Sequence, residues 1–245
     1  MKKGISLIVL VITIIVMIIL AASVVLTLSN TGIIERANHA TQLTNKNQLQ
    51  TSIDLMLGDM MLANNGQKPN SFELVEELYS NNIITDAQKT EMLTNGGNLK
   101  VGEEILRLDT TSIIDTYWIE TVKEDTAWKL RFQGILNKVD GLEYTEFGTM
   151  FLPKFILDRY NPEENALDKF TIANSEALTT VVIKSEKYTE KDNRYEWVAA
   201  LNQIPDSMKE REICVRAYAK YTYNGIEGII YSNIPEVIIA STISE

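Results

Sequence analysis

The sequence predicts an α+β protein with a long N-terminal helix, which is first transmembrane and then a stalk, a small helical region, and a C-terminal antiparallel β-sandwich. Three observations predict this class. Residues 5–28 are uniformly apolar, apolar residues recur every three or four positions later in residues 29–64, and apolar and polar residues alternate after Thr116. A spacing of three or four is typical of helices, and a spacing of two is typical of strands.

The predicted organisation has five parts. They are a leader (residues 1–4), a transmembrane helix (5–28), a helical stalk (29–64), a small helical or mixed region (65–112) and a β-sandwich (113–245). The boundaries are placed where the apolar run begins, where it gives way to polar residues, at a turn-forming Asn-Asn-Gly sequence, and where the period changes to two.

The N-terminal segment predicts membrane insertion. Residues 5–28 contain 17 Ile, Leu or Val residues and no charge, Pro, Gly, Asn or Gln. As a helix the segment is about 36 Å long, against about 30 Å for a bilayer's hydrocarbon core. Lys2 and Lys3 precede it, so the N-terminus is expected in the cytoplasm and the C-terminal domain outside. The alternative is a cleaved secretory signal, for which the apolar core is too long.

Helix signals continue through the stalk and the region after it. Ile53, Leu57 and Met60 have helical spacing, and the turn at residues 64–66 ends that helix. Residues 71–80 are predicted to form a helix with Ser71 as N-cap. Residues 85–93 are predicted to form another, in which Thr85 and Gln88 have the spacing of a capping box.

The C-terminal half has strand signals. Trp128, Leu130 and Phe132 alternate with polar residues, as expected of a half-buried antiparallel strand. Alternation at residues 213–222 places Ile213 and Val215 on one face of another strand and Arg216 on the other side. Asn224-Gly225 follows it and predicts a hairpin. Further apolar runs at residues 149–157, 178–184 and 234–240 are predicted strands.

Charge and composition exclude several functions. The net charge is −10, and residues 1–36 contribute +2, so residues 37–245 carry −12. Such an acidic domain lacks the basic face that binds nucleic acid. Cys214 is the only cysteine, which excludes an internal disulfide and a cysteine zinc site; its strand position favours a buried thiol over a cross-linking one. His39 is the only histidine, which excludes a multi-histidine metal site.

No residue is assigned a catalytic, cofactor-binding or metal-binding role. Paired acids such as Glu163-Glu164 and the run Glu190-Lys191-Asp192 lie in polar stretches that predict a solvated surface. No Walker loop, EF-hand loop or GxGxxG sequence is present. A calcium site in the acidic loops and a sugar site on exposed aromatic residues stay open as alternatives.

The order Lys2-Lys3-Gly4-Ile5 at the start of the apolar run resembles the prepilin leader of type IV pilins and of type II secretion pseudopilins. The resemblance covers residues 2 to about 40. It implies cleavage after Gly4 and methylation of the new N-terminal residue, Ile5. Pilins usually carry a glutamate at the fifth mature residue. Val9 stands at that position here, as in pilin-like proteins of the clostridial type.

A second resemblance covers residues 128–232. The segments 130–136, 144–153, 195–205 and 213–232 look like a β-sandwich module of Gram-positive surface proteins, with a fibronectin type III or Ig-like fold. That module implies no catalytic residue.

Together these resemblances imply a pilin-like, membrane-anchored surface protein that is a structural or adhesive subunit of a type IV pilus or a type II secretion-like filament. The implied partners are the lipid bilayer, a prepilin peptidase and other pilin-like subunits. No nucleic acid, cofactor or enzymatic activity is expected. The alternative is a stand-alone, signal-anchored extracellular β-sandwich module that binds a carbohydrate or protein ligand.

Overall fold

The computed structural model describes residues 13–18, 33–101, 104–124, 127–159, 169–232 and 236–239. The chain divides into two compact units, Met1–Ser52 with Lys100–Leu106, and Ile53–Leu99 with Arg107–Glu245. Residues 13–18 are helical. Helix α2 (Ile33–Ala63) begins in the first unit and ends in the second. The short strands β1 (Leu99–Val101) and β2 (Glu104–Leu106) pair with each other.

The predicted fold class, α+β with a long N-terminal transmembrane helix, is wrong. Of the residues that the structure describes, strands account for 43% and helices for 30%, and these strands form three antiparallel sheets. Within the described ranges, no helix is both long and apolar enough to cross a membrane. Helix α2 has the length, but Arg36, Lys46 and Asp54 within it make it polar. Residues 5–12 and 19–28 of the predicted segment lie outside the described residues.

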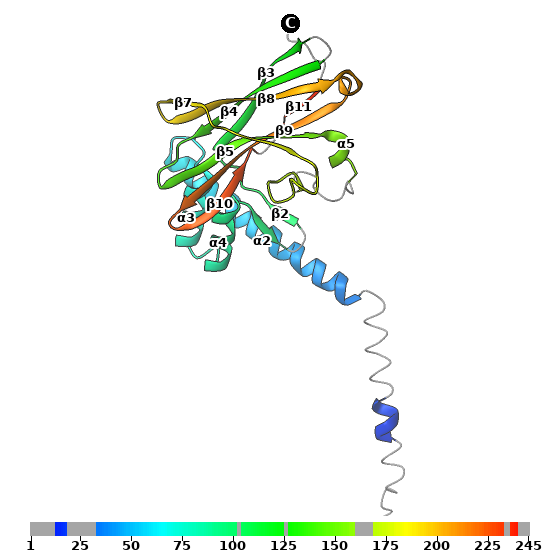
Figure 1. The fold of residues 1–245 in the computed structure, drawn as a ribbon. Helices are drawn as coiled ribbons and strands as arrows, with labels where there is room; N and C mark the ends of the chain where they lie inside the picture. Colours follow the sequence, from blue (N-terminus) through cyan, green and yellow to red (C-terminus); the bar gives the residue numbers. More distant parts are fainter. Residues whose placement is uncertain are drawn as a thin grey trace, which may run out of the picture. The chain divides into compact units, whose positions relative to one another are not determined.

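Two of the sheets build the second unit, and Figure 1 labels their strands except β6. The four-stranded sheet has the order β3-β4-β8-β7, with β3 (Ile114–Glu124), β4 (Ala127–Asn137), β8 (Arg194–Pro205) and β7 (Tyr188–Lys191). The five-stranded sheet has the order β10-β9-β5-β6, and β11 also pairs with β9. Its strands are β10 (Ile226–Tyr231), β9 (Glu212–Tyr223), β5 (Leu142–Pro153), β6 (Val181–Lys184) and β11 (Glu236–Ile239).

The inner faces of these two sheets pack against each other. The ring centroids of Phe132 on β4 and Phe151 on β5 lie 5.8 Å apart, and both side chains are fully buried. Trp197 on β8 donates from its indole nitrogen to the Thr149 hydroxyl on β5, at 3.0 Å. This hydrogen bond satisfies the Trp197 indole and the Thr149 hydroxyl between the sheets, where apolar side chains fill much of the space.

Gly134 on β4 provides the room for Trp197. It lies directly opposite Trp197 in the antiparallel register. A Cβ atom added at this glycine would lie 2.1 Å from the indole ring, which is far closer than van der Waals contact. The large aromatic side chain on β8 is therefore accommodated by the missing side chain on β4.

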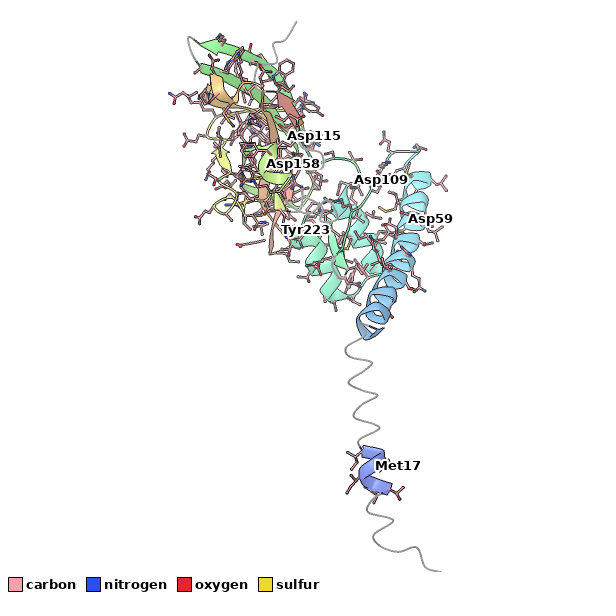
Figure 2. The ribbon with its side chains drawn as sticks, turned by 90° about the vertical axis from the view of Figure 1, so that its right-hand side faces the viewer. Met17, Asp59, Asp109, Asp115, Asp158 and Tyr223 are labelled. Carbon is pink, nitrogen blue, oxygen red and sulfur yellow. The ribbon has the colours of Figure 1, made fainter. Side chains whose placement is uncertain are left out.

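The helical region packs on the end of the five-stranded sheet. Helices α3 (Ser71–Ser80) and α4 (Asp86–Thr94) contact each other, and α4 contacts β10. Phe72 on α3 meets Tyr221 on β9 edge to face, with centroids 5.1 Å apart. The Tyr221 hydroxyl donates to the Leu93 carbonyl and accepts from the Gly96 amide at 3.1 Å. Tyr223, at the same junction, is labelled in Figure 2.

The caps of both helices test the sequence predictions. The capping box of Thr85 and Gln88 at α4 is confirmed. The prediction of Ser71 as N-cap of α3 is wrong, because Asn70 caps the helix and forms a capping box with Glu73. Ser71 is instead a buried first-turn residue. Asn is as good an N-cap as Ser, so the propensity of the two residues could not separate them.

The outer face of the five-stranded sheet is covered by the connection from β5 to β6, which begins with the short helix α5 (Lys154–Leu157). A buried apolar cluster lies there, formed by Met150, Leu152, Leu157, Phe170, Leu178, Cys214 and Tyr218. Arg216 lies on this outer face, on the opposite side of β9 from Val215 as the alternation predicts, and it is 5% exposed. Its guanidinium donates to the carbonyls of Phe170 at 2.8 Å and Ser232 at 3.0 Å. Strand β9 is therefore buried on both faces.

The hairpin predicted at Asn224-Gly225 is confirmed between β9 and β10. Both residues have positive φ, 49° and 79°, as a two-residue type I′ turn requires. The predicted burial of Cys214 is also confirmed. The run at residues 149–157 is only partly strand, because α5 begins at Lys154.

Candidate functional site

The residues that the sequence assigned to leader processing, Gly4 and Ile5, lie outside the described residues, as does Val9. The structure therefore does not place them. Within the second unit, a different surface stands out as a candidate site. It is the outer face of the four-stranded sheet, called the open face below.

Strand alternation decides which side chains reach the open face. Residues opposite each other in an antiparallel pair point to the same side of the sheet. Tyr117 on β3 pairs with Gln133 on β4, and Gln133 pairs with Val198 on β8. Glu196 on β8 pairs with Thr189 on β7. These five side chains share the open face, while the alternate positions, such as Trp197, point into the core.

Two apolar side chains remain half exposed on the open face. Tyr117 and Val198 are each 50% exposed, and they flank Gln133 in one cross-strand row. Single exposed apolar residues are ordinary, but here the row lies beside a groove. The groove has a volume of about 320 Å³ and is lined by Gln133, Lys187, Tyr188, Thr189, Glu196, Trp197 and Val198.

A second cavity in this unit is much smaller. Its volume is about 20 Å³, and Ser71, Gly96 and Tyr231 are among its lining residues. This is space for about one water molecule. The groove on the open face is the larger of the two and has a volume in the range of small-ligand sites.

Glu196 is the most constrained polar residue of the open face. Its side chain is only 9% exposed, because neighbouring long side chains lie over it. The ammonium of Lys191 lies 2.8 Å from Oε2, and a guanidinium nitrogen of Arg194 lies 2.6 Å from Oε1. The Gln133 amide nitrogen lies 3.3 Å from Oε2. The carboxylate is held at the floor of the groove with two cations beside it.

The two cations also determine the acidity of Glu196. The hydrogen bond from Lys191, together with the charge of Arg194, holds the pKa of this carboxyl group below its usual range. Glu196 therefore stays ionised at neutral pH and is a weak proton acceptor. The arrangement suits fixed ion pairing and hydrogen bonding with a ligand better than proton transfer.

An aromatic cluster behind β7 and β8 supports the groove. The ring of Tyr188 lies 5.2 Å from the ring of Phe147 and 5.5 Å from that of Tyr195, measured between centroids. The Phe147 ring also contacts Trp197 at 4.9 Å. These edge-to-face and tilted contacts fix the edge strand β7 against the sandwich. These ring contacts therefore hold the groove-lining residues of β7 in place, although β7 has only four residues.

Nucleophilic and metal chemistry find little support in the described part of the chain. Burial raises the pKa of the Cys214 thiol to about 11, so the thiolate is scarce at neutral pH. Among the residues that the structure describes, no group of three or more His, Cys, Asp or Glu side chains is placed to hold a metal ion.

Sequence reasoning missed the open face. It treated Lys191 as part of a solvated run. The available signal was Val198, an apolar residue that lies on the opposite side of its strand from Trp197 and Ala199. Pairing of Glu196 with Lys191 on β7 could be inferred only with the strand register in hand.

Comparisons with known proteins give no relative for this chain. No family model, no curated protein and no solved structure matches it.

Proposed function

We propose that the chain is a pilin-like surface protein, held at the membrane by its apolar N-terminal segment, with a structural or adhesive role in a filament. The observation that carries the proposal is the order of residues at the N-terminus. A basic leader ending in Gly4 is followed at once by the uninterrupted apolar residues 5–28. Processing at the cytoplasmic side of the membrane would leave Ile5 as a new apolar N-terminus.

The helix that follows is consistent with this role. α2 begins at Ile33, five residues after the apolar run, and is polar along its first half. Ile53 and Leu57 in its second half are 1% and 8% exposed, so this part belongs to the core of the second unit. In the proposed protein, α2 connects the membrane-held segment to an exposed β-rich unit that is not an enzyme.

Mass spectrometry of the protein isolated from its native host tests the proposal. We expect a mature chain that begins at Ile5 and carries an N-terminal methyl group. Gly4→Val should abolish this processing. Gly58→Ala is the matched control, because an added Cβ at Gly58 meets no atom within 4 Å. A native chain that retains Met1 to Gly4 would overturn the proposal.

A second candidate function is a stand-alone, anchored module that binds a carbohydrate or protein ligand. The groove on the open face favours it, because its lining combines a carboxylate, an amide, a hydroxyl and a lysine. Binding of the full-length protein to a glycan array, together with an absence of filament association in the host, would favour this candidate.

A further inference from the structure

The outer faces of the two sheets of the second unit differ in how far other segments of the chain cover them. The five-stranded sheet is covered by its own β5–β6 connection, which buries Met150 and Leu152 completely. The open face has no such cover among the described residues, and Tyr117 and Val198 on it stay half exposed. A sheet face with exposed apolar residues and a groove has the character of a surface that binds a partner.

The charge of the open face indicates the chemistry of that partner. Lys187 lines the groove, and Lys191 and Arg194 pair with its carboxylate, Glu196, so these four side chains sum to +2. Glu190 lies between Lys187 and Lys191 in the sequence, but it pairs with Tyr195 and points to the other side of the sheet. Strand alternation therefore keeps this carboxylate away from the groove. Residues 37–245 carry −12, so this is a cationic surface on an acidic protein. An acidic partner is favoured.

The helix pair α3–α4 is an acidic segment of the same chain. Residues 71–98 contain five carboxylates and one lysine, for a net charge of −4, which is a third of the −12 of residues 37–245. Glu73 and Glu77 are exposed and lie four residues apart, on one side of α3. Asp86 at the start of α4 is also exposed. The helix pair therefore offers a negative surface.

We infer that the open face of one copy binds the α3–α4 helix pair of a second copy. This inference rests on the proposed filament function and names its subunit contact. The two surfaces belong to different elements of one compact unit, since α3 and α4 pack on β9 and β10 while the open face belongs to the four-stranded sheet. A contact between two different surfaces is heterologous, and it continues from copy to copy instead of closing into a symmetric dimer.

Charge-reversal variants of the full-length chain in detergent test the inference by sedimentation velocity. Lys187→Glu changes an exposed residue of the groove, and Glu77→Lys changes an exposed residue of α3. Each variant alone should associate about tenfold more weakly than the wild type, because like charges then face each other. An equal mixture of the two should recover association, since each variant keeps the intact surface that the other lacks.

Two matched controls separate this contact from general charge effects. Lys209→Glu and Glu210→Lys make the same charge changes at exposed residues outside both surfaces, and they should leave association unchanged. Thermal unfolding of all four variants should match the wild type. Association that is insensitive to Lys187→Glu, or a mixture that does not recover it, would overturn the inference.

Failure of the inference can be told apart from failure of the proposed function. If the chain is processed at Gly4 but neither charge reversal changes its association, the filament role stands and the proposed interface is rejected. An intact leader removes the filament role, whatever the sedimentation result. Capture of an acidic glycan by the wild type and not by Lys187→Glu, with no association between copies, would assign the open face to a carbohydrate and reject the second copy.

Discussion

The outer faces of the two sheets show how one strand pattern leads to two different surfaces. On the five-stranded sheet, the polar residue Arg216 is buried under the β5–β6 connection and donates to backbone carbonyls. On the four-stranded sheet, Arg194 stays at the surface and pairs with Glu196. Both arginines stand at polar positions of alternating strands. The difference shows that a second layer of chain, and not the strand itself, decides whether a polar position is buried.

The comparison predicts its largest effect at apolar positions. Leu152 on the covered face is fully buried, whereas Val198 on the open face is half exposed. Leu152→Ala should lower the free energy of unfolding by about 2–5 kcal/mol, because it removes buried surface and leaves a cavity. Val198→Ala should change it by less than about 0.5 kcal/mol. Urea unfolding of the full-length chain measures both, and equal losses would contradict the distinction between the faces.

A smaller effect is expected for the two arginines. Arg216→Met should cost roughly 1–3 kcal/mol, because the carbonyls of Phe170 and Ser232 lose their donor in a buried site. Arg194→Met is the matched variant and should cost less than about 1 kcal/mol, as exposed ion pairs contribute little. The same unfolding measurement compares them. If Arg194→Met were the more costly change, the open face would be more tightly built than we describe.

The smallest effect concerns Glu146, on the same side of the five-stranded sheet as Arg216 but at its less covered end. Its carboxylate lies 2.9 Å from the Lys184 ammonium and 3.0 Å from that of Lys220, and Tyr218 donates to it at 3.1 Å. These groups, Lys184 foremost, lower the pKa of Glu146 from 4.5 to about 2. The resulting stabilisation is present above pH 4.5 and is lost as the pH falls toward 2.

The pH dependence of Glu146→Gln checks this assignment. At pH 7 the variant should be less stable than the wild type by on the order of 1 kcal/mol, given the partial exposure of the pair. At pH 2 the difference should be much smaller, because the wild-type carboxyl group is then about half protonated and most of the stabilisation is lost. A difference that persists unchanged at pH 2 would indicate lost packing in place of lost charge interaction.

The sequence by itself determined the features that depend on neighbouring residues. The capping box of Thr85 and Gln88, the hairpin at Asn224-Gly225 and the buried alternation at Trp128 each arise from interactions over a few positions, so a short window contains their cause. The same reasoning misplaced the cap at Asn70, where two adjacent residues had similar propensity.

Only the tertiary structure decided the balance of strand and helix, the burial of Arg216 and the composition of the open face. The predicted fold class was wrong because the proportion of strand to helix depends on which distant segments of the chain pair. Cover over β9 comes from Leu157, Phe170 and Leu178 of the β5–β6 connection, and Glu196 meets Gln133 across 63 positions of chain. Such contacts depend on the pairing of distant strands, which local periodicity does not specify.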